Sequence, residues 1–166
     1  SGAPTVSAPG SSSTGSYTVS WSAVGNASSY ELRENSSTVY SGGNLSAGIG
    51  GRGNGTYTYS ARACNNAGCG AWGAGVSTTV ALIPLTPTGG QQSWDNIGGK
   101  RWQYNASWNA SANATSYELQ GYFTYNGPNT SASTVKVGTN APSDNPSYRV
   151  RACNANGCSE WSAWFQ

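Results

Sequence analysis

The chain has 166 residues, which is room for one ordinary domain or two small ones. Only 8% of the residues are charged and the formal net charge is +2, so the sequence lacks the concentrated basic face of nucleic-acid-binding proteins. Histidine is absent, which excludes Ser-His and Cys-His nucleophile pairs, and no apolar run approaches the roughly 20 residues of a membrane helix. We therefore expect no nucleic-acid partner and no membrane insertion.

Alternation of apolar and polar residues predicts short β-strands along the chain, because one face of each strand is buried and the other is exposed. The alternation is clearest over residues 17–21, 30–33, 57–63, 102–108 and 148–152. Glycine, with 23 residues, gathers between such segments, notably in 41–44 and 50–55, as turns require. With 7 Trp and 10 Tyr to fill a core, the sequence predicts an all-β fold.

The sequence contains an internal repeat. Residues 21–32, a Trp followed nine residues later by Tyr-Glu-Leu, recur 87 positions later as 108–119. Residues 63–72, which begin Ala-Cys-Asn and end in Trp, recur 89 positions later as 152–161. A period near 90 residues is too long for a solenoid repeat and suits one small sandwich per copy.

The repeat sets the expected domain boundaries. We predict a first domain over residues 1–82, a short linker over 83–87, and a second domain over 88–166 with a short last strand. The linker carries two prolines, which favour an extended and stiff segment. The predicted fold is thus two tandem immunoglobulin-like β-sandwiches.

The order of these motifs resembles the fibronectin type III family over both copies. A strand with Trp is followed by Tyr-Glu-Leu, by Tyr-x-Tyr-x-Ala-Arg-Ala over 57–63, and by a tight hairpin. The chain is most similar to bacterial repeats with an Ala-Cys-Asn…Gly-Cys hairpin, as in Rhs/YD-repeat proteins and extracellular polysaccharide-degrading enzymes. The resemblance implies seven-stranded sandwiches used as spacer or adhesion modules. It also makes Tyr57 the tyrosine-corner residue, whereas Pro146 stands at that position in the second copy.

The four cysteines favour one disulfide in each copy. Cys64 and Cys69 flank a four-residue turn, as do Cys153 and Cys158, and residues on the two arms of a hairpin can face each other at bonding distance. A zinc site is the rival interpretation, although histidine is absent and the pairs lie in separate domains. Free thiols are the third. Disulfides imply an oxidising compartment, and hence a secreted or cell-surface protein.

Arginine and tryptophan recur together after each hairpin. Residues 159–164 resemble the Trp-Ser-x-Trp box of cytokine-receptor fibronectin domains, in which tryptophans stack on arginines of the preceding strand. The resemblance implies stacking among Arg62, Trp72, Arg149, Arg151, Trp161 and Trp164. We interpret the set as a structural ladder, with a partner-binding face as the alternative. Cross-strand ion pairs are expected between Glu31 and Arg62 and between Glu118 and Arg151.

No set of residues in the sequence predicts catalysis, a cofactor or a metal. A glycosidase needs two carboxylates held across a cleft, and the six acidic residues are repeat-equivalent or scattered among loops and chain ends. The leading hypothesis is therefore a non-catalytic extracellular spacer or adhesion module, with other domains of a parent protein as partners.

Two alternatives remain. The first is a carbohydrate-binding accessory module, because the second copy carries aromatic residues that the first lacks. Its candidate glycan-binding residues are Trp94, expected in a loop, and Tyr122 and Tyr125, expected to border a loop at 126–129. The second is a structural subunit that self-associates, with another protein chain as partner, through the short last strand.

Overall fold

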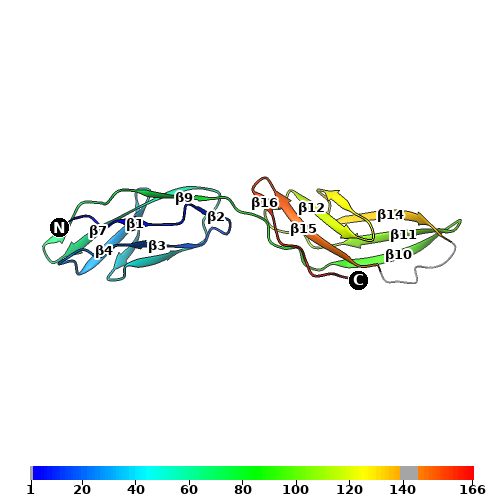
Figure 1. Cartoon of the computed structure of the whole chain (residues 1–166), viewed down its shortest axis with the longest axis horizontal. Coiled ribbons are helices and arrows are strands. Elements are labelled where there is room, and N and C mark those ends of the chain that lie inside the picture. Colours follow the sequence, from blue (N-terminus) through cyan, green and yellow to red (C-terminus); the bar gives the residue numbers. More distant parts are fainter. Residues whose placement is uncertain (1, 139–145) are drawn as a thin grey trace. The chain divides into compact units, whose positions relative to one another are not determined.

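A computed structural model describes residues 2–138 and 146–166 of the chain (Figure 1). All regular structure in these residues is β-strand, from β1 to β16. The described residues contain no helix of the length and apolarity that crossing a membrane requires. The chain divides into two compact units, unit 1 (Ser1–Leu82) and unit 2 (Ile83–Gln166), and this division places the expected linker, 83–87, within unit 2.

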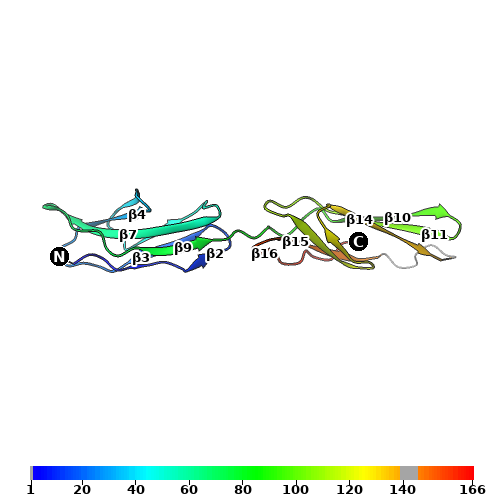
Figure 2. The same cartoon turned by 90° about the horizontal axis from the view of Figure 1, so that it is seen from above.

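Unit 1 is a sandwich of two sheets with the orders β1-β3-β6 and β2-β9-β7-β4-β5, and β8 pairs with β7. The long β7 runs along much of this unit (Figure 2). β2 lies parallel to β9 and covers the edge of the larger sheet. The strands of this unit are β1 Val6–Ser7, β2 Ser11–Ser12, β3 Tyr17–Trp21, β4 Ser29–Glu34, β5 Ser37–Gly42, β6 Ser46–Ile49, β7 Gly55–Asn65, β8 Gly68–Cys69 and β9 Val76–Val80.

The core of unit 1 comes from the inward-facing positions of the predicted strands. Tyr59 and Ala61 of β7 are fully buried, as is Leu32 of β4, which pairs with Ala61. Val19 and Trp21 of β3 join the same buried cluster from the other sheet. Buried rings of this size remove roughly 150–250 Å² each from water, so they supply much of the hydrophobic stabilisation.

Unit 2 is a second sandwich, with the sheet orders β10-β11-β14 and β13-β12-β15-β16. β10, β11 and β14 lie side by side (Figure 1), and a turn with positive φ at Gly98, Gly99 and Lys100 joins the first two. The strands are β10 Gln91–Gly98, β11 Arg101–Ser107, β12 Ser116–Gly121, β13 Tyr125–Gly127, β14 Ser131–Val137, β15 Tyr148–Asn154 and β16 Gly157–Cys158.

The structure corrects two expectations for unit 2. Trp94 lies in β10, opposite Tyr104, and not in a loop. The sequence misses β10 because most of its side chains are exposed, so apolar residues do not alternate along it. The expected loop at 126–129 is also partly wrong, because β13 extends to Gly127.

The end of unit 2 differs from that of unit 1. The last strand is reduced to a single antiparallel bridge between Tyr148 and Phe165. In unit 1 the equivalent segment continues as the five-residue β9. Tyr57 of unit 1 donates a hydrogen bond from its hydroxyl to the carbonyl oxygen of Gly53 at 3.2 Å, as the resemblance implies. Pro146, buried at the equivalent position of unit 2, has no hydroxyl to offer.

Candidate functional site

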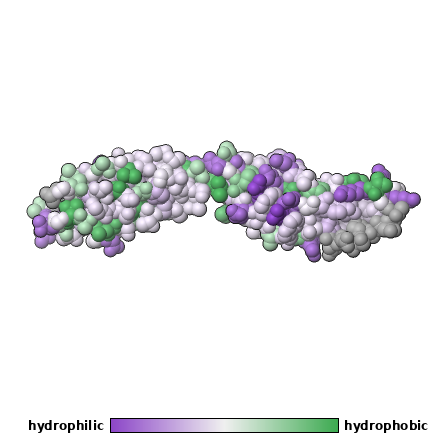
Figure 3. All heavy atoms as spheres, in the orientation of Figure 1, coloured by the Kyte–Doolittle hydropathy of each residue, from purple (hydrophilic) through white to green (hydrophobic). Residues whose placement is uncertain are grey.

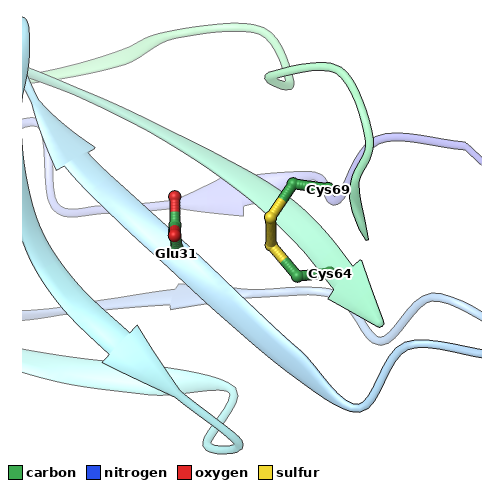
Figure 4. Close-up of side chains that lie close together, drawn as sticks. All are labelled: Glu31, Cys64 and Cys69. Carbon is green, nitrogen blue, oxygen red and sulfur yellow. A yellow bond between two sulfur atoms is a disulfide. The ribbon is translucent and has the colours of Figure 1, made fainter. Parts of the chain in front are cut away.

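Each unit has a disulfide in its hairpin. Cys64 and Cys69 are bonded, with an S–S distance of 2.01 Å, and so are Cys153 and Cys158. The carboxylate of Glu31 on β4 lies beside the first bridge (Figure 4), and its oxygen and the two sulfurs are all within 4.8 Å of one another. Because the sulfurs are bonded to each other, they are not thiolate ligands for zinc in this state.

An arginine–tryptophan stack lies on the outward side of each larger sheet. In unit 1 the guanidinium carbons of Arg33 and Arg62 lie 4.5 and 4.6 Å from the centroid of Trp72. Arg62 is predicted from the sequence, whereas Arg33 is not. The signal for Arg33 was its spacing, since it lies two residues after Glu31 and hence on the same strand face.

Unit 2 builds the same stack differently. The guanidinium carbon of Arg149 lies 5.0 Å from the ring centroids of both Trp161 and Trp164, and that of Arg151 lies 4.8 Å from Trp161. Arg149 pairs across the sheet with Gln120, where unit 1 pairs Ser60 with Arg33. The extra arginine has therefore changed strands between the units while the stack is preserved.

The repeated glutamates hold these stacks in place. Glu31 binds Arg62, and Glu118 binds Arg151, each at 2.7 Å between Nη2 and Oε2. The four side chains are between 25% and 33% exposed, so solvent screens the pairs and each contributes about 1 kcal/mol or less to stability. Their main effect is to hold each guanidinium over a tryptophan ring.

The segment after the hairpin pairs with β15 through serine side chains in unit 2. Ser159 and Ser162 accept hydrogen bonds at their hydroxyl oxygens from the backbone N–H groups of Ala152 and Val150, at 3.1 and 3.0 Å. Unit 1 has glycine at the position of Ser162, Gly73, because a Cβ there would lie 2.3 Å from the carbonyl oxygen of Pro4.

Unit 1 has a partly buried polar network that is not predicted from the sequence. The Tyr59 hydroxyl donates to Glu34 Oε2 at 2.5 Å, and Arg52 Nε donates to the same oxygen at 2.7 Å. Tyr17 contributes its hydroxyl, 2.8 Å from that of Tyr59. Burial, and then the hydrogen bond to Glu34, raises the pKa of Tyr59 well above its ordinary value, and the hydrogen bond to Glu34 raises the pKa of Arg52.

Unit 2 has glycine, Gly121, at the position of Glu34. Tyr148 and Gly121 pair where unit 1 pairs Tyr59 and Glu34. The Tyr148 hydroxyl is buried and makes no hydrogen bond to another described residue. Burial raises the pKa of Tyr148 to about 12, and a hydrogen bond with Tyr122 raises that of Tyr104 to about 12.

The three candidate glycan-binding residues do not form one platform. Trp94 packs edge-on against Trp102 with ring centroids 5.3 Å apart. Trp102 begins the alternation over 102–108, which predicts a buried face, but it is only partly buried. Tyr122 packs on Tyr104 at 4.6 Å, and the ammonium nitrogen of Lys136 lies 3.7 Å above its ring. Tyr125 lies apart from these, on β13.

Tyr125 borders a groove along the open side of unit 2. Its ring packs against the buried Trp108, with centroids 6.1 Å apart, and its hydroxyl accepts a hydrogen bond from the Asn129 backbone N–H at 2.8 Å. The groove encloses about 430 Å³ and is also lined by Phe123 and Asn129. Phe123 and Asn129 are missing from the sequence-based candidates.

Comparisons with known proteins show similarity to solved structures only. No family model matches the sequence, and no curated protein does. The FN1–FN3 domains of chicken CNTN1 share 16% identity at a TM-score of 0.43, covering 98% of this chain, which spans 63% of that structure. The fibronectin(III)-like modules of Clostridium thermocellum CbhA share 13% sequence identity at a TM-score of 0.41, and the match covers 95% of this chain and 90% of that structure. The central fibronectin-III array of RIM-binding protein shares 18% sequence identity at a TM-score of 0.36, and the match covers 98% of this chain and 62% of that structure.

The titles of these three structures name fibronectin type III domains or fibronectin(III)-like modules. The predicted all-β class and tandem β-sandwich architecture are confirmed by the strands, sheet orders and two compact units of the structure itself.

Proposed function

We propose that the chain is a non-catalytic extracellular module that serves as a spacer or adhesion segment of a larger secreted or cell-surface protein. The observation that carries this proposal is that three glutamates form ion pairs with arginines of their own unit. Glu31, Glu34 and Glu118 are each bound at 2.7 Å by an arginine of their own unit. Carboxylates engaged in this way stabilise the sandwich, whereas glycoside hydrolysis needs a pair that faces a substrate across a cleft.

The hairpin disulfides support the extracellular part of the proposal. Both are intact, and both close small loops within one unit. Bonds of this kind persist in oxidising compartments and are rare in the cytosol. The Ala-Cys-Asn…Gly-Cys hairpin, which resembles that of bacterial surface repeats, points to a bacterial parent protein whose other domains are the partners of this chain.

A spacer is tested by placing the chain between a donor and an acceptor fluorescent protein. We expect a lower transfer efficiency than for a Gly-Ser linker of equal length, because folded units do not collapse as a flexible coil does. Transfer equal to that of the flexible linker, or release of sugars from a polysaccharide panel by the purified chain, would refute the proposal.

A further inference from the structure

The groove on unit 2 lies where two sheet edges face each other. β13 is the edge strand of one sheet and β14 is the edge strand of the other. Residues 105–107, 123–125 and 131–133 line the groove together with Asn129. Its volume of about 430 Å³ lies within the range of roughly 300–1,000 Å³ that small-ligand sites occupy.

The lining has one chemical character. It contains two aromatic rings and several hydroxyl and amide side chains, and none of its residues is charged. The polar side chains of Thr124, Asn129, Ser131 and Ser133 make no hydrogen bond to another described residue, so their donors and acceptors are free for a ligand. A charged ligand would find no counter-ion among these residues, whereas a neutral polyhydroxylated ligand would find both hydrogen-bonding groups and apolar faces.

The two rings are fixed before any ligand arrives. Phe123 meets the fully buried Tyr148 edge-on at 5.1 Å, and Tyr125 packs against Trp108. Both rings are only partly buried, so each retains some exposed surface. Rings held in this way lose little conformational entropy when a ligand packs against them.

Unit 1 differs at the equivalent point. Val19 and Ala47 pair on β3 and β6, where unit 2 pairs Ala106 and Ala132 on β11 and β14. Val19 is fully buried, whereas the smaller Ala106, also buried, lies in the wall of the groove. β5 of unit 1 has six residues, whereas the equivalent strand of unit 2, β13, has three. Residues 122–124 therefore lie outside the sheet, at the mouth of the groove.

From these observations we infer that the groove of unit 2 binds a neutral oligosaccharide, which packs against Phe123 and Tyr125 and is hydrogen-bonded by Asn129. This inference is independent of the spacer role, since units can separate domains whether or not the groove is filled. An extended peptide paired with the free edge of β14 is the competing occupant. The polar lining does not favour it, because strand addition gains specificity from pockets for alternate side chains.

The test is a nuclear magnetic resonance titration of the full chain with neutral hexasaccharides. The probes are cellohexaose, chitohexaose, xylohexaose, mannohexaose, laminarihexaose and maltohexaose, with a polygalacturonate oligomer as the charged control. Intact mass first establishes that Asn105 and Asn129, which lie in Asn-x-Ser sequons, carry no covalent glycan that would fill the groove. We expect at least one neutral probe to shift the amide signals of residues 123–133 with a Kd below about 1 mM, and the charged oligomer to leave them unchanged.

Two variants and a repeat-equivalent control sharpen the test. Asn129→Ala should weaken binding about fivefold to tenfold, through loss of a hydrogen bond to the ligand. Ala106→Val, which copies unit 1, should weaken it by narrowing the groove. Asn44→Ala is the matched control, because the Asn44 backbone N–H also bonds a tyrosine hydroxyl, Tyr40, at 2.9 Å, but in unit 1. It should leave binding unchanged.

Three results would overturn the inference. The first is no shift with any neutral probe at about 10 mM, well above the expected Kd. The second is binding that Asn129→Ala and Ala106→Val leave intact in variants whose spectra show that they are folded. The third is protection of β14 amide hydrogens by a Thr-Val repeat peptide in the absence of any response to sugars, which would assign the groove to strand addition. None of these results would bear on the fluorescence test of the spacer role.

Discussion

The two units share the arginine–tryptophan stacks on their outer faces. They differ in the polar contacts made by the buried tyrosine of the larger sheet. Both have a hairpin disulfide, a glutamate bound to arginine, and arginine stacked on tryptophan. Unit 1 adds a partly buried carboxylate, Glu34, that binds Arg52 and Tyr59, whereas unit 2 has Gly121 there and leaves the Tyr148 hydroxyl without a bond to a described residue. Two copies of one fold can thus keep the same arginine–tryptophan stack on the surface while their internal polar contacts differ.

The largest effect should come from removing the carboxylate of unit 1. Glu34→Ala leaves Arg52 and the buried Tyr59 hydroxyl without their acceptor, so we expect the free energy of unfolding of unit 1 to fall by about 3 kcal/mol. Chemical denaturation measures the change. Glu31→Ala is the control, because its more exposed pair should contribute about 1 kcal/mol or less. Equal losses for the two variants would contradict the distinction between buried and exposed pairs.

High pH should destabilise unit 2, because two of its tyrosines have raised pKa values in the folded state. The pKa of Tyr148 and of Tyr104 is raised in the folded state, to about 12, so the unfolded chain releases their protons first. The stability that these residues contribute is complete below pH 10 and is lost as the pH rises towards 12, by up to about 2–3 kcal/mol for the fully buried Tyr148. Denaturation at several pH values between 9 and 12 checks this. Tyr148→Phe should reduce the loss, and an unchanged pH profile in that variant would count against a buried hydroxyl.

A matched pair of substitutions compares the two hydroxyls directly. Tyr59→Phe should destabilise unit 1 by about 2 kcal/mol, because Glu34 loses a donor in a partly buried site. Tyr148→Phe should leave unit 2 unchanged or stabilise it slightly, because it removes a buried hydroxyl that has no partner among the described residues. Thermal unfolding of both variants decides the matter. A larger loss in unit 2 than in unit 1 would reverse the comparison.

The smallest effect concerns the arginine that changes strands. Arg149→Ser should lower the stability of unit 2 by about 1 kcal/mol through loss of stacking on Trp161 and Trp164. Adding Gln120→Arg should restore most of it, since this places the guanidinium on the neighbouring strand, as Arg33 is in unit 1. A double variant no more stable than the single one would show that the two arrangements are not equivalent.

The sequence predicts the parts of this protein that repeat or alternate. The alternation over 57–63 locates the buried face of β7, and the equal spacing of cysteines in the two copies locates both hairpins. The Glu34 network is invisible at this level, because Arg52 lies in a glycine-rich segment and reaches Glu34 only through the folded chain. The β10 strand is missed because its side chains are mostly exposed.

The groove of unit 2 could have been found in part from the sequence. Aligning the copies sets Ala106 against Val19, and this loss of side-chain volume signals room in the second core. What the alignment does not reveal is that residues 122–124 lie outside the sheet, between β12 and the short β13. Packing at the edges of a sandwich is decided by such local lengths more than by residue types.

The central feature of this protein is two oxidised units, each closed by a disulfide in its own hairpin. The direct measurement is mass spectrometry of a non-reducing digest of chain exported to an oxidising compartment, after alkylation under denaturing conditions. We predict no alkylated cysteine and two peptides that each contain an internal disulfide, one between Cys64 and Cys69 and one between Cys153 and Cys158. Four alkylated cysteines, or a bridge between the two units, would contradict it.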